Sequence, residues 1–230
     1  MRRNQIIMGT GVSLDIPEAK NEVIFSDVFE LLRQIDAQFS PYKTDSELSR
    51  YQQGEIIQEG LSAEMREIMD GCKKFQKLTN GYFSANFAGK FNPTGYVKGW
   101  AIARAGELVK KRGYGTYCIG IGGDILARSG GSKEWQIGIQ DPTDKSKILN
   151  TLSISNGAVA TSGNYERGLH IINPKTGKPA NELLSLTVIG PDIIRADVLA
   201  TAAFAMGKAG VKFVDRQKGY KALAVAREIV

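Results

Sequence analysis

The chain is poor in residues that build metal centres and disulfide frameworks, with two cysteines and one histidine among 230 residues. Cys72 and Cys118 lie far apart, and no histidine or further cysteine accompanies either of them. This spacing excludes a Cys-x-x-Cys redox pair and a cysteine-based zinc site. Two isolated cysteines are typical of a reducing compartment, and one disulfide between them is the alternative.

The sequence also lacks a long apolar run. Arg2 and Arg3 stand near the start, but the roughly 7–15 apolar residues of a signal peptide do not follow them. No segment approaches the roughly 20 apolar residues that a membrane-spanning helix needs. We therefore expect a cytoplasmic protein, or an exported one whose leader has been removed, and in either case no membrane span.

Basic residues are numerous but scattered. The net charge is +6 and the pI is about 9.2, which favours an anionic partner without identifying it. The short basic run 110–112 falls at a predicted helix end, and no basic cluster is interleaved with aromatic residues. A solvated surface explains this distribution better than a nucleic-acid-binding face, so we expect no nucleic-acid partner.

Glycine, by contrast, is abundant, and its 26 residues predict many tight turns. Apolar periodicity predicts helices over 18–38, 62–80, 97–111, 196–207 and 208–217. Apolar runs between turn residues predict strands over 6–16, 117–121, 134–140, 151–154, 169–172, 184–189 and 222–226. Candidate helix caps are Asp45 or Ser46, Ser62 and Thr94, and candidate stops are Gly113 and Gly207. Mixed helices and adjacent strands favour an α+β fold over a doubly wound sheet.

Residues 195–207 form the most informative segment, an Ala-rich apolar helix closed by glycine. The polar side chains inside it, Asp197 and Thr201, are four residues apart and therefore project from one helix face. A carboxylate in apolar surroundings is costly unless it is paired or binds a metal, and such oxygen ligands suit Mg²⁺. The pair predicts a metal site. The alternative is an aspartate favoured by the helix dipole, with Thr201 bonded back to the main chain.

The segment 92–100 leads into a predicted helix. Backbone N–H groups at a helix N-terminus bind phosphate, Gly95 and Gly99 allow a ligand to approach the backbone, and Lys98 adds a positive charge. The segment is not a Walker A motif, because the GxxxxGK[ST] pattern is absent. It predicts a phosphate site, and an ordinary turn before an amphipathic helix is the alternative.

Two further segments are candidate ligand contacts. Gly122, Gly123 and Asp124 follow a predicted strand and resemble half of a dinucleotide fingerprint, but the third glycine and the helix are missing, because 127–131 reads as a turn. They predict either a bend against which a flavin or nucleotide lies or a plain hairpin. Thr161 and Ser162 supply hydroxyl groups that either hold phosphate oxygens or belong to a turn.

His170, the single histidine, stands on a predicted strand that runs into a Pro-Gly turn. A histidine titrates near neutral pH and is the usual acid–base residue of an enzyme. The alternative is a structural histidine whose ring is satisfied by its neighbours.

The order of these motifs is more specific than any one of them. Along the chain follow 8–10, 40–42 with 46–47, 95–99, 121–124, 161–165, 170–174 with 176–177, and the pair Asp197 and Thr201. This run, over residues 6–207, resembles the FAD:protein FMN transferase (ApbE) family. The resemblance implies a single flavin transferase domain over 1–230, of α+β class with a T-fold-like core.

The family transfers the FMN half of FAD, with Mg²⁺, to a threonine of an acceptor flavoprotein and releases AMP. Carried onto this chain, the resemblance implies FAD as substrate, Mg²⁺ as cofactor and such a flavoprotein as partner. The implied metal ligands are the backbone carbonyl of Val97 and the side chains of Asp197 and Thr201. The implied FAD contacts are Met8, Tyr42, Asn92, Lys98, Gly122, Gly123, Asp124, Thr161 and Ser162. His170 is the implied catalytic residue.

Three positions depart from the family pattern. Asn92, Ala103 and Asn173 stand where the family usually has aspartate. The change at Asn173 is expected to be tolerated, because Asn and Asp both close Asx turns, whereas the other two remove carboxylates near the ligand. Two alternatives to the transferase therefore stay open: a Mg²⁺-dependent FAD pyrophosphatase and a non-catalytic FAD-binding or delivery protein.

Overall fold

The computed structural model describes residues 1–87, 89–164 and 171–227 of the chain. Its main element is a seven-stranded sheet in the order β1-β2-β5-β6-β9-β10-β11, in which every neighbouring pair is antiparallel. The strands are β1 (Arg2–Ile7), β2 (Thr10–Asp15), β5 (Tyr117–Ile121), β6 (Asp124–Arg128), β9 (Gly157–Gly163), β10 (Leu183–Gly190) and β11 (Lys221–Ala226).

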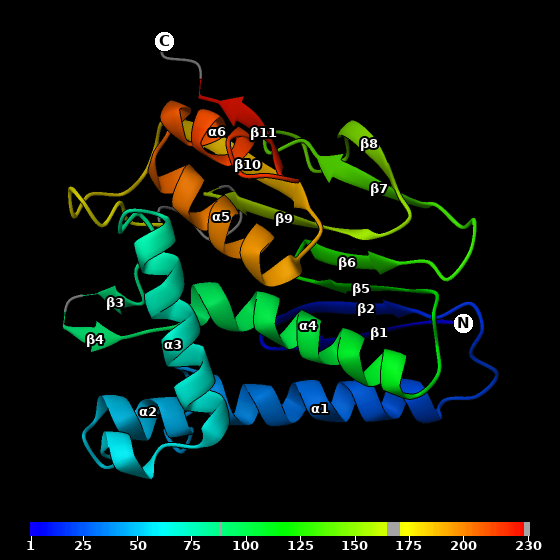
Figure 1. Cartoon of the computed structure of the whole chain (residues 1–230), viewed down its shortest axis with the longest axis horizontal. Helices are drawn as coiled ribbons and strands as arrows, with labels where there is room; N and C mark the ends of the chain where they lie inside the picture. Colours follow the sequence, from blue (N-terminus) through cyan, green and yellow to red (C-terminus); the bar gives the residue numbers. More distant parts are fainter. Residues whose placement is uncertain (88, 165–170, 228–230) are drawn as a thin grey trace.

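Helices cover one face of this sheet (Figure 1). They are α1 (Val23–Phe39), α4 (Thr94–Lys111), α5 (Ile193–Ala205) and α6 (Lys208–Asp215). Helix α4 contacts both α1 and α5, and α5 packs on β9 and β10. The small residues of α5 permit this close packing, because Ala196, Ala200 and Ala203 are fully buried.

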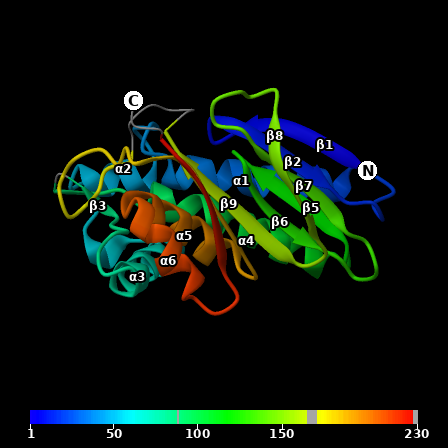
Figure 2. The same cartoon turned by 90° about the horizontal axis from the view of Figure 1, so that it is seen from above.

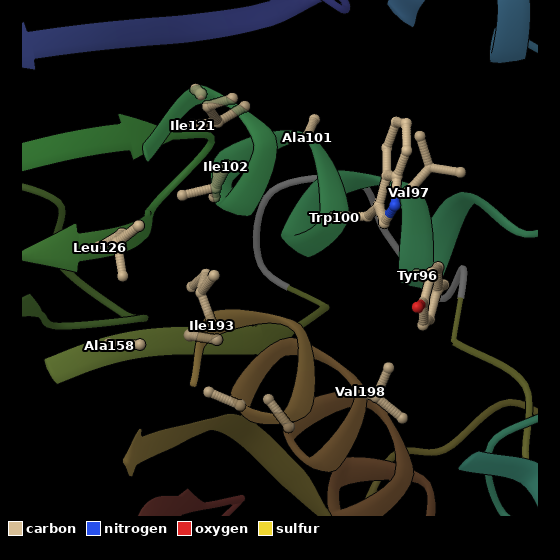
Figure 3. Close-up of a cluster of buried hydrophobic side chains, with 14 of the residues drawn as sticks. Tyr96, Val97, Trp100, Ala101, Ile102, Ile121, Leu126, Ala158, Ile193 and Val198 are labelled. Carbon is tan, nitrogen blue, oxygen red and sulfur yellow. The ribbon is translucent and has the colours of Figure 1, made fainter. Parts of the chain in front are cut away.

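The main hydrophobic core lies between these helices and the sheet. Figure 3 shows α4 and α5 side by side, with Ile102 of α4 and Ile193 of α5 on the side of Leu126 of the sheet. Trp100 and Val198 belong to the same buried cluster and lie farther along the two helices. Alternation along a strand places successive residues on opposite faces. Ala158 therefore joins this core, whereas Val159 belongs to a second cluster on the other face.

A hairpin outside the main sheet covers that other face (Figure 2). It pairs β7 (Trp135–Gln140) with β8 (Ile148–Ile154). Trp135 and Ile137 are buried against Ala127 and Val159 of the sheet, while the odd-even alternation leaves Gln136 exposed. The sheet is thus sandwiched between the helices and this hairpin over part of its area.

The remaining elements lie on the left of Figure 1, beside the ends of α1 and α4. They are α2 (Glu47–Gln52), the 3₁₀ turn η1 (Gln58–Gly60), α3 (Ala63–Leu78) and the short pair β3 (Asn86–Phe87) and β4 (Lys90–Phe91). Ser46 and Ser62 cap α2 and α3, each accepting a hydrogen bond from the backbone three residues on, as the sequence predicts.

The structure confirms the α+β class and most of the expected helices. It corrects several boundaries. The expected strand 6–16 is two strands, because Met8 and Gly9 take positive φ and form a tight turn between β1 and β2. Helix α4 begins at Thr94 with Pro93 at its N-cap, so Thr94 is not the cap.

Strands β3, β4, β6 and β9 were not expected from the sequence, and one expected strand is absent from the described residues. The segment 127–131 was expected to be a turn, yet Ala127 and Arg128 continue strand β6. β9 occupies a segment that was interpreted as a hydroxyl-bearing turn. Of the expected strand 169–172, the described residues contribute only an isolated bridge between Ile172 and Pro179.

Candidate functional site

A lysine and two buried aspartates from three different elements meet beside the N-terminal part of α4. Lys98 on α4 places Nζ 2.7 Å from Oδ2 of Asp124, which begins β6, and 3.7 Å from Oδ1 of Asp197 on α5. Asp124 is 0% exposed and Asp197 is 3% exposed, whereas the Lys98 side chain keeps 29% of its surface in solvent. The cluster carries two carboxylates and one ammonium group, so it has one net negative charge when all three are ionised.

Asp197 is held by the backbone of α4. The N–H of Gly99 donates a hydrogen bond of 2.9 Å to Asp197 Oδ2. A Cβ at Gly99 would lie 3.1 Å from Asp197 Oδ2 and 3.1 Å from the carbonyl oxygen of Ile193, so glycine permits this crossing of α4 and α5. Gly99 was expected to admit a ligand to the backbone. Helix α5 fills that space instead, and it brings Asp197 with it.

Burial raises the pKa of Asp197 to about 7; the neighbouring Lys98 opposes the rise and the carboxylate of Asp124 adds to it. A buried carboxyl of this kind holds a proton near neutral pH or attracts a cation. The environment of Asp197 therefore favours bound positive charge.

Hydroxyl groups of β9 flank the charged cluster. The N–H of Thr161 donates to Asp124 Oδ1 at 3.0 Å, and the Thr161 hydroxyl lies 2.8 Å from that of Thr187 on β10. The next residue, Ser162, faces α5, where its hydroxyl lies 3.4 Å from Thr201 Oγ1. The structure thus brings Thr201, Ser162 and Asp197 to the same side of the sheet, while Thr161 fixes the orientation of Asp124.

A tight turn directly precedes Asp124. Gly122 and Gly123 have φ of 56° and 90° and connect β5 to β6, so they form a hairpin turn without a following helix. The N–H of Gly122 donates to the carbonyl of Gly11 at 3.0 Å, in the strand that follows the turn at Met8. This contact places the turn at Gly122 and Gly123 beside the strand that follows the turn at Met8.

Two predicted residues, Tyr42 and Asn92, are exposed and make none of the contacts described above, and a third is not among the described residues. Tyr42 is 90% exposed on the loop before α2. Asn92 is exposed at the start of α4, where its side-chain oxygen accepts a hydrogen bond from the N–H of Thr94. His170 lies outside the described residues.

Two open hollows on the surface have other linings. One of about 440 Å³ lies against the β1–β2 hairpin, and one of about 620 Å³ lies between α1, α2 and the segment leading to α3. Neither is lined by Lys98, Asp124 or Asp197. The charged cluster, and not the size of a cavity, therefore identifies the candidate site.

Comparison with known proteins agrees with the motif order. The sequence model of the ApbE family matches residues 8–92 and 87–224, which is most of the chain. The chain belongs to the ApbE family. Curated relatives include the FAD:protein FMN transferase of Klebsiella pneumoniae (strain 342), 30% identical over 57% of this chain and 41% of the relative. That of Haemophilus influenzae is 24% identical over 83% of this chain and 74% of the relative. The chain therefore matches about two fifths of the length of the first of these.

Solved structures of ApbE proteins share the fold. The ApbE protein of Thermotoga maritima superposes with a TM-score of 0.85 at 23% identity and covers 98% of this chain and 94% of its own. The flavin transferase ApbE of Vibrio cholerae gives a TM-score of 0.76 at 21% identity, over 98% and 96% of the two chains. These likenesses support the α+β fold of this ApbE-family chain over nearly its whole length.

The donor set at α5 fits a divalent cation of the Mg²⁺ type. The N–H of Gly99 binds Oδ2 of Asp197. The other carboxylate oxygen, Oδ1, faces the positively charged ammonium group of Lys98. Thr201 is one helical turn away. Val97 lies inside the first turns of α4, and a backbone carbonyl there has a second lone pair beyond its helical hydrogen bond. Among the described residues no group of three or more His, Cys, Asp or Glu side chains is arranged to hold a metal ion.

The sequence did not reveal three structural roles in this ApbE-family chain. Gly99 is the donor to Asp197, and Thr187 completes the hydroxyl pair with Thr161. Asn173 donates from Nδ2 to the carbonyl of Ala205 at 2.9 Å, at the end of α5, and accepts from the N–H of Lys175 through Oδ1. An aspartate would keep the second bond and lose the first, so Asn173 does more than close an Asx turn. The signal in the sequence for Gly99 was a glycine within the segment 92–100, which was interpreted as a place where a ligand approaches the backbone.

Proposed function

We propose that this ApbE-family protein transfers the FMN moiety of FAD to a threonine of an acceptor flavoprotein, with Mg²⁺, and releases AMP. The convergence of Lys98, Asp124 and Asp197 from α4, β6 and α5 carries the proposal. Phosphoryl transfer depends mainly on charge neutralisation and alignment of the reacting groups. The site combines an ammonium group, a helix N-terminus and a carboxylate that favours bound positive charge.

The proposed metal ligands are the side chains of Asp197 and Thr201 and the carbonyl of Val97. When bound there, Mg²⁺ would neutralise pyrophosphate oxygens and polarise the phosphorus that is attacked. Gly99 holds the carboxylate in place through its N–H, so the position of this ligand is fixed by the crossing of α4 and α5. Rigid placement of this kind is what charge stabilisation in a transition state requires.

The proposed FAD contacts fall into two groups. The turn at Gly122 and Gly123 presents backbone next to Asp124 and contacts the strand that follows the turn at Met8, and Lys98 offers an ammonium group to the phosphates. Ser162 offers a hydroxyl from the side of α5. Tyr42 and Asn92 remain proposed contacts on the strength of the resemblance. His170 is the proposed base that takes the proton of the attacking threonine hydroxyl, and this role rests on the sequence.

A single assay tests the proposal. The protein is incubated with FAD, Mg²⁺ and a flavoprotein that carries a candidate target threonine, and the products are separated by chromatography and mass spectrometry. We expect the acceptor to gain the mass of FMN in a phosphoester while AMP is released. Asp197→Asn keeps an oxygen for the Gly99 N–H and removes the charge, so it should abolish the Mg²⁺-dependent product. Asp36→Asn, on an exposed ion pair with Lys43, is the matched control.

The same assay separates the alternatives. Free FMN together with AMP and an unmodified acceptor would replace the transferase with a FAD pyrophosphatase. Unchanged FAD with tight binding would replace it with a FAD-binding or delivery protein. Full activity of Asp197→Asn at low Mg²⁺ would show that this carboxylate is not a metal ligand.

A further inference from the structure

We propose that Lys98 is a built-in counter-ion for Asp197, which a divalent cation must displace, and that Asp124 is the positioning residue that receives the displaced ammonium group. The inference rests on the proposed metal site at Asp197 and concerns what this chain does before a cation arrives. In this proposal Asp124 acts by holding the side chain of Lys98, in place of the direct FAD contact that the resemblance implies.

The distances make the lysine an asymmetric bridge. Nζ of Lys98 lies 2.7 Å from Asp124 Oδ2 and 3.7 Å from Asp197 Oδ1. The closer carboxylate is fixed by the N–H of Thr161 and the farther one by the N–H of Gly99. Both acceptors are therefore held by backbone, whereas the lysine stem has four rotatable carbons and 29% exposure. The lysine is the member of the cluster that can move.

The charge balance gives a reason for the movement. Two buried carboxylates share one ammonium group, and an isolated buried charge is costly. Without a cation, Lys98 offsets part of the charge of both aspartates. A divalent ion at Asp197 would stand within a few ångströms of that ammonium group, and like charges at such a distance repel strongly in a poorly solvated site. When Lys98 moves away from Asp197, its ion pair with Asp124, the nearer carboxylate, keeps the ammonium group within the site.

The first test measures cation binding without flavin. Mg²⁺ and Mn²⁺ are titrated into the purified protein by calorimetry, and thermal unfolding is followed over the same concentrations. Lys98→Met should bind the cation at least about tenfold more tightly, melt at a lower temperature without cation, and regain more of its melting temperature when the cation is added. Lys43→Met is the matched control, because Lys43 also pairs with an aspartate, Asp36 at 2.6 Å, and neither residue belongs to the charged cluster.

A double-mutant cycle separates displacement from simple electrostatics. Asp124→Asn keeps an oxygen for the Thr161 N–H but no longer attracts Lys98, so the lysine should turn to Asp197 and weaken cation binding. In the Lys98→Met background the same change should alter the dissociation constant by less than about twofold. Equal effects of Asp124→Asn in both backgrounds would mean that its charge acts directly on the cation and would overturn the positioning role.

The release itself can be observed by lysine footprinting. Wild-type protein is treated with a trace of acetic anhydride, and peptides are quantified by mass spectrometry at increasing Mg²⁺. We expect acetylation of Lys98 to rise severalfold as the cation binds, while that of Lys43 stays constant. Unchanged or falling acetylation of Lys98, or cation binding by Lys98→Met no tighter than by wild type, would overturn the inference. Flavin transfer measured in parallel on wild type reports separately on the proposed function.

Discussion

The N–H of Gly99 and the carboxylate of Asp197 are joined by a 2.9 Å hydrogen bond at the crossing of α4 and α5. This bond ties the proposed metal ligand to the helix that carries Lys98. It exists because Gly99 has no side chain, since a Cβ there would lie 3.1 Å from three atoms of α5. One small residue therefore determines both the packing of two helices and the geometry of the charged site.

Gly99→Ala should destabilise the protein by about 1–3 kcal/mol, because the added methyl group overpacks the crossing by more than the ~1 kcal/mol that alanine gains in a helix. Guanidinium unfolding followed by circular dichroism measures the change. Gly131→Ala is the control, because a Cβ at that exposed position meets nothing within 4 Å. A Gly99→Ala protein as stable as wild type would mean that the helices separate without cost.

Both cysteines should resist thiol reagents over a wide pH range. Burial raises the pKa of Cys72 to about 12 and that of Cys118 to about 11, from an ordinary value of 9.0. Between pH 9 and about 11–12 the folded protein keeps both thiols protonated, whereas an unfolded chain would ionise them. The contribution of the two thiols to the stability of the fold is therefore complete below pH 9 and is lost as the pH rises toward 11–12. At pH 8 the native protein should be labelled by a disulfide reagent about 10²-fold more slowly than unfolded protein, because raised pKa values leave far fewer thiolates. Protein in guanidinium provides the fully reactive reference, and Cys118→Ala isolates the signal of Cys72.

Asn173→Asp restores the residue that the family usually carries and should nevertheless destabilise this chain by about 1–2 kcal/mol. The carboxylate would replace a donor with an acceptor opposite the carbonyl of Ala205, at the negative end of the α5 dipole. Chemical unfolding measures the loss. Asn21→Asp is the matched control, because Asn21 only accepts a hydrogen bond, from the N–H of Val23. Equal stability of both variants and wild type would show that the amide bond to Ala205 contributes nothing.

His170→Ala should lower the rate of flavin transfer by about 10²-fold or more while leaving FAD affinity nearly unchanged, because a general base acts on the chemical step and not on binding. Single-turnover transfer and fluorescence quenching of FAD measure the two quantities separately. A variant that transfers at the wild-type rate would assign His170 to a structural role.

The sequence predicted the parts of this molecule that depend on local pattern. The periodicity of α1 and α3, the serine caps and the polar pair on α5 are encoded within a few residues. The sequence could not predict β9, because four of its five buried positions are Gly157, Ala158, Ala160 and Ser162, and only Val159 is β-branched. It placed Lys98, Asp124 and Asp197 in one site only through the order of motifs. Their distances depend on the crossing of α4 with α5 and on the hairpin turn at Gly122, which are tertiary features.

Asn92→Asp should change FAD affinity by no more than about tenfold, or roughly 1.4 kcal/mol. Asn92 is exposed and its side-chain oxygen accepts the N–H of Thr94, a bond that aspartate can also make. The added charge suits the positive end of the α4 dipole but repels the phosphates of a bound dinucleotide, so the two effects offset each other. Fluorescence quenching with FAD measures the affinity, and the transfer assay is run beside it, with Asn21→Asp as an exposed control. A large gain in transfer on restoring the carboxylate would mean that this chain has lost part of the family's chemistry. The FAD-binding or delivery protein would then replace the transferase as the favoured function.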